Sequence, residues 1–117
     1  MGKVRYPFND AEALSIEDAG TSTLQIDGPA IASIDTPGQE ITALSLLAGD
    51  TLMAGDEVVV DISQGATGRD VTFGSAGSTI VAPALTGVAN DRDVITLVWT
   101  ATEFIAKTAW LKIVDAA

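Results

Sequence analysis

Carboxylate side chains are the main groups in this sequence that could do chemistry. The chain contains 16 Asp and Glu residues but no His and no Cys. The absence of those two residue types excludes imidazole acid–base catalysis, thiolate nucleophiles and Cys/His zinc sites. The nearest carboxylate pairs in the sequence are Asp56 with Glu57 and Asp91 with Asp93.

Neither pair has the spacing that carboxylate catalysis requires. A glycosidase needs two carboxyl groups that face each other across the scissile bond, whereas neighbouring residues such as Asp56 and Glu57 point to opposite faces of a strand. Asp91 and Asp93 flank Arg92 in a segment of turn-forming residues. We therefore expect solvated turn and strand-edge positions, no catalytic residue and a protein that is not an enzyme.

Two further motifs are candidates for binding a small ion. The segment 90–93, Asn-Asp-Arg-Asp, offers three oxygen side chains for calcium, but it lacks the longer spaced loop that ends in Glu. The segment 74–78, Gly-Ser-Ala-Gly-Ser, is similar to a phosphate-binding loop but has neither a following Lys nor a helix. A type I turn and a surface loop are the preferred interpretations, so the sequence predicts no metal and no cofactor.

The charge balance bears on the partners of the chain. The formal net charge is −10, with six Lys and Arg residues, so binding to nucleic acid or to an anionic membrane surface would work against strong repulsion. No apolar run approaches the roughly 20 residues that a membrane-spanning helix needs. We expect neither nucleic acid nor a membrane as a partner.

The elements that must position these residues are β-strands, because short runs rich in Val, Ile and Thr alternate with Gly, Pro, Asp and Asn. The expected strands are 23–27, 30–34, 40–47, 57–63, 71–73, 79–81, 94–100, 103–107 and 111–114. The strand 94–100 is apolar on both faces and is expected to be central, with 103–107 as its hairpin partner. A length of 117 residues fits one all-β domain, a jelly roll or β-sandwich, with a small closed barrel as the alternative.

We divide the chain into an extended N-terminal arm, residues 1–20, and a β-domain, residues 21–117. Asn9 or Asp10 is expected to cap a short helical turn that runs through Leu14. Basic and apolar residues alternate near the start of the arm, which would suit docking by addition of a strand to the sheet edge of a partner. The candidate docking residues there are Lys3, Val4, Arg5, Tyr6 and Phe8. The alternatives are a frayed terminus and an arm packed on its own domain.

The aromatic residues of the domain divide into two groups. Phe73, Trp99 and Phe104 lie within apolar strands and are expected in the core. Trp110 lies near the C-terminus and is a further candidate for docking a partner, with core packing as the alternative.

Four segments of the chain resemble a small β-jelly-roll module of bacteriophage virion proteins, which include head decoration, head-fibre and tail-fibre proteins. The matching segments are Asp61-Ile-Ser-Gln64, Ala66-Thr-Gly68-Arg-Asp70-Val-Thr-Phe73, Ala84-Leu-Thr86 and Asp93-Val-Ile-Thr-Leu-Val-Trp99. In the module a strand that ends in Gln leads through an Ala-Thr-Gly loop to a Val-Thr-Phe strand. The module often has Asp-Gly-Thr after its last long strand, where this chain has Thr100-Ala101-Thr102.

The resemblance implies a homotrimer on a virion, with the major capsid protein or another virion protein as its partner. Strands that are apolar on both faces are compatible with contacts between copies. Three copies would carry three times −10 charges, which favours the outer capsid surface over the inside, where packaged nucleic acid would repel them. Because the chain lacks a repeat or coiled coil that could form a shaft, we expect a decoration, or cement, protein. The alternatives are a fibre module that contacts the host and, from another class, a carbohydrate-binding module.

Overall fold

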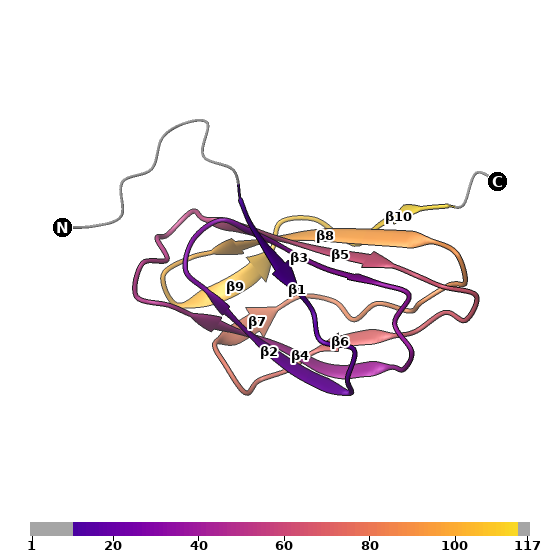
Figure 1. The fold of residues 1–117 in the computed structure, drawn as a ribbon. Coiled ribbons are helices and arrows are strands. Elements are labelled where there is room, and N and C mark those ends of the chain that lie inside the picture. Colours follow the sequence, from indigo (N-terminus) through magenta and orange to yellow (C-terminus); the bar gives the residue numbers. More distant parts are fainter. Residues whose placement is uncertain (1–10, 115–117) are drawn as a thin grey trace.

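The computed structural model describes residues 11–114, and this part of the chain is all-β, as the sequence predicts (Figure 1). No helix occurs in it, and therefore none that could span a membrane. Its ten strands are β1 (Glu12–Ser15), β2 (Thr21–Ile26), β3 (Ala30–Asp35), β4 (Ile41–Ala48), β5 (Glu57–Ser63), β6 (Val71–Phe73), β7 (Thr79–Val81), β8 (Arg92–Trp99), β9 (Glu103–Ala106) and β10 (Leu111–Ile113).

The strands form two sheets that pack face to face. The larger sheet has the order β1-β3-β5-β8-β9-β7, with β10 also paired to β8, and the smaller sheet has the order β2-β4-β6. Strands β1 to β6 alternate between the two sheets, and their pairs within each sheet are parallel. β8 pairs antiparallel with β5, β9 and β10.

This connectivity is a solenoid-like coil in the first half of the domain, followed by a part built on the antiparallel pairs of β8, in which β7 pairs in parallel with β9. The two packed layers agree with the expected sandwich, whereas the parallel pairs differ from the antiparallel Greek keys of a jelly roll. Parallel neighbours need a crossover between them. Here the crossover from β1 to β3 is strand β2 of the opposite sheet, so a short connection is enough.

The core lies between the sheets and follows the alternation of side chains along the strands. Val58, Val60 and Ile62 of β5 are fully buried, and they face Leu44 and Leu46 of the smaller sheet. Burial of each such side chain stabilises the fold by roughly 1.5–3 kcal/mol relative to exposure. Since every second residue of β5 points inward, the remaining residues of that strand face outward from the larger sheet.

The N-terminal part of the domain differs from the sequence prediction. The expected helical turn through Leu14 is wrong, because Glu12–Ser15 forms β1, which pairs in parallel with β3. Leu14 packs against the core from this edge strand, and burial there outweighs the local capping signal. Residues 11–20, which the sequence groups with the arm, thus contribute a strand to the larger sheet.

The predicted hairpin between the last long strand and 103–107 is confirmed as β8 and β9. The Thr100 amide donates to the Glu103 carbonyl at 2.9 Å, which closes a two-residue turn. Ala101 has φ 89°, and Thr102 has no positive φ, which is the pattern of a type II′ turn. Glycine is the usual residue at the first central position of that turn, so Ala101 holds a conformation that is strained for an L-residue.

Candidate functional site

The candidate docking residues fall in two places. Lys3, Val4, Arg5, Tyr6 and Phe8 lie outside the described residues. Trp110 is partly buried and stacks on Phe73, with ring centroids 6.0 Å apart and an interplanar angle of 16°. Its Nε1–H donates to the carbonyl of Pro83 at 2.9 Å. The indole therefore joins the C-terminal segment to the loop after β7 and packs against the core.

The other aromatic residues also pack against one another. Phe104 is fully buried, which confirms its expected place in the core. Trp99 is partly buried and contacts Phe104 at a centroid distance of 4.7 Å. Phe73 is likewise partly buried against the core. The described aromatic rings thus lie in the core or at its edge.

The first carboxylate pair is divided between two structural roles. Asp56 is buried, and its Oδ2 accepts a hydrogen bond from the Met53 amide at 2.8 Å, which closes the turn before β5. Glu57 lies on the outer face of the larger sheet, and its Oε2 is 2.7 Å from Lys107 Nζ. The two side chains therefore point to opposite faces, as the strand geometry predicts.

The second carboxylate pair lies at the start of β8. Asp91 is buried after a turn in which Asn90 has φ 65°. Asp93 is fully buried within β8, and its Oδ1 is 2.8 Å from Lys112 Nζ. No group of three ligand-type side chains that could hold a metal ion occurs in residues 11–114. No pocket is found in the same part of the chain.

The Gly-rich segment 74–78 lies along the edge of β4, after β6 on the same side. The amides of Gly74 and Ser78 donate to the carbonyls of Leu44 and Leu46 at 2.8 and 2.7 Å. The Ala76 amide is 3.2 Å from Ser45 Oγ. These N–H groups are bound by the neighbouring strand β4, so the segment expected as a surface loop is a loop held at the edge of that strand.

The segments that carry the resemblance meet at one end of the molecule, at the right of Figure 1. Gln64, directly after β5, is buried and uses its side-chain amide as a peptide group would. Its Nε2 donates to the Arg69 carbonyl at 3.0 Å, and its Oε1 accepts from the Arg69 amide at 2.9 Å. These two bonds close the loop 65–68. The Gln64 backbone amide also donates to the Asp91 carbonyl at 2.8 Å.

The segment around Leu85 is held against the start of β6. Val71 and Leu85 exchange two backbone hydrogen bonds, of 3.0 and 2.7 Å. Asp70 Oδ1 accepts from the Gly87 amide at 2.9 Å. Gly68 lies so close to this segment that a Cβ atom there would collide with the Gly87 carbonyl. Glycine is therefore required by close approach of two backbones at this position.

The ion pair between Asp93 and Lys112 joins the start of β8 to the segment around Leu85. Lys112 Nζ donates to Asp93 Oδ1 and also to the Thr86 carbonyl at 3.3 Å. We use the name loop cluster for residues 64–70, 84–87 and 91–93. Segments separated by up to some thirty residues in sequence thus form one contiguous unit.

Hydrogen bonds within the loop cluster hold its loops in fixed positions. Its amide and carboxylate groups bind backbone N–H and C=O groups, which fixes three loops at the end where β5 stops and β8 begins. The sequence indicates these segments as loops and strand ends, but not the roles of Gln64, Asp70 and Lys112. The sequence does contain a signal for Gln64. This polar residue occupies the next inward-facing position after Val58, Val60 and Ile62.

Comparison with known proteins adds no relative. No family model, no curated protein and no solved structure matches the chain.

Proposed function

We propose that the protein is a bacteriophage virion structural protein, a trimeric decoration protein that binds the outer surface of the capsid and bridges its subunits. One observation carries this proposal. The four segments that resemble the virion module were chosen from the sequence alone, and each contacts another of them in the structure. Gln64 binds Arg69, Val71 pairs with Leu85, and the end of β5 pairs with the start of β8. The segments of the resemblance therefore belong to one structural unit, and this supports the proposal.

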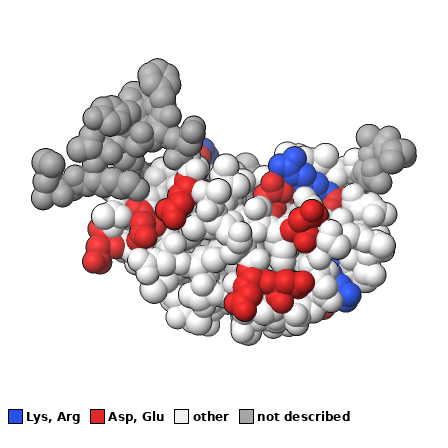
Figure 2. Space-filling model, in the orientation of Figure 1, with Lys and Arg blue, Asp and Glu red and all other residues white. Residues whose placement is uncertain are grey.

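The surface charge is compatible with an external position. Figure 2 shows acidic side chains spread over the visible face of the molecule, with few basic side chains between them. The net charge of −10 would oppose contact with packaged nucleic acid. Binding to a capsid would then depend on buried area and on simultaneous contacts with several subunits.

The experiment is to isolate virions of the phage that encodes the chain and to quantify it by mass spectrometry against the major capsid protein. We expect a copy number comparable with that of the capsid protein, and release of the chain without loss of the head. A few copies per particle, recovered with tails or fibres, would favour the fibre role. Absence from purified virions would contradict both roles.

Deletion of residues 1–9 tests the arm in the same assay. We expect the domain to fold, because β1 begins at Glu12, and the occupancy on the particle to fall. The melting temperature of the deletion variant is the control for folding. Unchanged occupancy would show that the candidate residues Lys3, Val4, Arg5, Tyr6 and Phe8 do not dock.

A further inference from the structure

Strand β2 leaves one edge of the smaller sheet open. It has β4 on one side and no strand on the other within residues 11–114 (Figure 1). The carbonyls of Gly20 and Ile26 each accept a hydrogen bond at 2.8 Å from an amide in or directly after β4. Because backbone groups alternate in direction along a strand, the even-numbered residues of β2 turn theirs toward β4. The odd-numbered residues turn theirs to the open edge, and these are Thr21, Thr23 and Gln25.

The core is incompletely covered at the same end. Leu14 of β1 and Leu24 of β2 face inward from the edge strands of the two sheets, and both are only partly buried. The residues paired with them on the next strands, Ala32 and Leu46, are fully buried. A further strand beside β2 would therefore cover both the open backbone groups and this end of the core.

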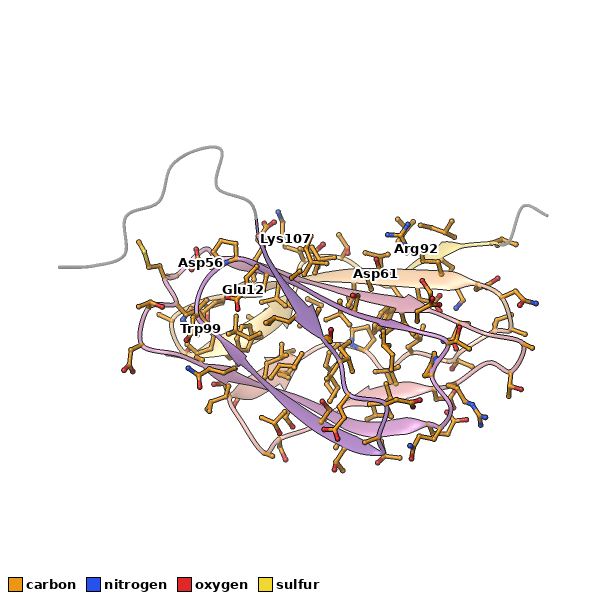
Figure 3. All side chains as sticks on the ribbon, viewed as in Figure 1. Glu12, Asp56, Asp61, Arg92, Trp99 and Lys107 are labelled. Atoms are coloured by element: carbon orange, nitrogen blue, oxygen red, sulfur yellow. The ribbon has the colours of Figure 1, made fainter. Side chains whose placement is uncertain are left out.

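The chain enters the domain beside the end of β2. The Glu12 amide donates to the Pro29 carbonyl at 3.0 Å, and Pro29 belongs to the link 27–29 between β2 and β3. Figure 3 labels Glu12 on the first strand. Ten residues precede the described part of the chain, and six residues span the roughly 20 Å of β2. Residues 3–8 are therefore long enough to lie along β2, with 9–11 as a link of the same length as 27–29.

We propose that residues 3–8 add as a parallel strand to the open edge of β2 in their own chain. The register of the first coil predicts which residues meet. Glu12 of β1 pairs with Ala30 of β3, 18 positions later in the sequence. The same spacing places three alternating apolar residues beside the three inward-facing residues of β2, that is Val4, Tyr6 and Phe8 beside Ser22, Leu24 and Ile26.

The proline of the segment fits this register. In a parallel pair, a residue that turns its backbone groups to its neighbour bonds the residues before and after its Cα partner. Thr23 would therefore bond residues 4 and 6, and Gln25 would bond residues 6 and 8, so no bond requires an amide at Pro7. Proline is tolerated in an edge strand where its nitrogen faces away from the sheet, and the register gives Pro7 such a position.

The inference concerns the single chain and does not rest on the virion role. It divides the candidate docking residues of the arm into two groups. Val4, Tyr6 and Phe8 would close the end of the core, whereas Lys3 and Arg5 would lie on the outer face of the smaller sheet. A partner of this region would then meet two basic side chains on a sheet and not a free arm.

The test is amide hydrogen exchange by NMR in the full chain and in a variant that lacks residues 1–9. The Thr23 and Gln25 amides turn to the open edge, whereas the Leu24 amide turns to β4 and reports that the sheet is folded. We expect the Thr23 and Gln25 amides to exchange at least about tenfold more slowly in the full chain, with the Leu24 amide protected in both proteins. Equal exchange of the Thr23 and Gln25 amides in the two proteins would overturn the inference.

Two proline variants of the full chain test the register without a deletion. Tyr6→Pro removes the amide that would bond the Thr23 carbonyl, and Arg5→Pro removes an amide that would face solvent. We expect Tyr6→Pro to accelerate exchange of the Gln25 amide at least about tenfold and Arg5→Pro to change it less than about threefold. Equal effects of the two substitutions would contradict the register.

A mixing experiment assigns the segment to its own chain. The isotope-labelled deletion variant is unfolded and refolded together with the unlabelled full chain. We expect the Thr23 and Gln25 amides of the labelled variant to exchange rapidly, because each full chain covers its own edge. Slow exchange there would show that the segment covers β2 of a second copy, which would overturn the inference. Occupancy on the virion is measured separately, so either result leaves the proposed function to its own test.

Discussion

Removal of the Lys112 ammonium group should destabilise the domain more than removal of any exposed cation. Asp93 is fully buried, and its Oδ1 is 2.8 Å from Lys112 Nζ. The second oxygen of Asp93, Oδ2, is buried and accepts no hydrogen bond from residues 11–114. The substitution Lys112→Met keeps most of the aliphatic stem but removes the ammonium group that pairs with the buried carboxylate.

The size of the effect can be worked from the burial of the two partners. Breaking a buried ion pair by removal of one partner costs about 3–5 kcal/mol. The side chain of Lys112 is 41% exposed, so water can reach part of the vacated space and lower this cost. We expect a loss of about 2–3 kcal/mol in the free energy of unfolding. For a domain of this size, that loss lowers the melting temperature by about 10 °C.

The assay is urea unfolding, with Lys107→Met as the matched control. Lys107 forms an ion pair of similar length, 2.7 Å, but its side chain is 53% exposed and that of Glu57 is 44% exposed. The same substitution there should cost less than about 1 kcal/mol. The double variant Asp93→Asn with Lys112→Met should recover part of the loss, because no buried charge remains. Equal losses from Lys112→Met and Lys107→Met would refute the reasoning, since burial would then have no effect.

Three further changes test the turns and loops. Ala101→Gly should raise the free energy of unfolding by about 0.5–1 kcal/mol, because it relieves φ 89°, and Thr102→Gly in the same turn should give no gain in thermal unfolding. Gln64→Ala should cost about 2–3 kcal/mol by leaving two backbone groups of Arg69 unpaired, and hydrogen exchange at the Arg69 amide should become faster. A normal exchange rate there would contradict the role of Gln64. Trp110→Phe should cost about 1 kcal/mol, since stacking remains and one hydrogen bond is lost; a neutral result in urea would show that this bond adds nothing to stability.

The class of the fold could be read from local patterns, because alternation reports directly which side chains face inward. Val58, Val60 and Ile62 are fully buried, as the period of two predicts for that strand. The hairpin of β8 and β9 was predictable for a similar reason, since a very short link between two strands leaves antiparallel pairing as the available arrangement.

The parallel pairs could not be read in the same way. Alternation shows which face of a strand is buried but not which strand lies beside it. The segment between β1 and β3 contains β2, and its pattern fits either an antiparallel neighbour or a strand of the opposite sheet. The choice depends on tertiary packing of the two layers. The same packing overrode the capping signal of Asn9 or Asp10, so that Leu14 lies in a strand.

The candidate site was predictable in its segments but not in its contacts. The spacing along the chain showed the loops around Gln64, Asp70 and Leu85, since turn residues separate the strands there. The contact between Asp70 and Gly87 joins residues 17 positions apart, and that between Lys112 and Asp93 joins residues 19 positions apart. Such pairs depend on the register of strands that local patterns leave undetermined.

Aliphatic side chains lie on both faces of β8, but the two faces have different surroundings. The sequence predicts a central strand, and within the sheet β8 is central, because it pairs with β5, β9 and β10. In-plane pairing satisfies its backbone but covers neither face. The smaller sheet covers one face, where Ile95 and Leu97 are fully buried. Val94 and Val98 lie on the other face, over which residues 11–114 place no second layer. Aliphatic residues on both faces are typical of strands in sheets that are covered on both sides, so the pattern of β8 could not show that residues 11–114 cover only the face of Ile95 and Leu97.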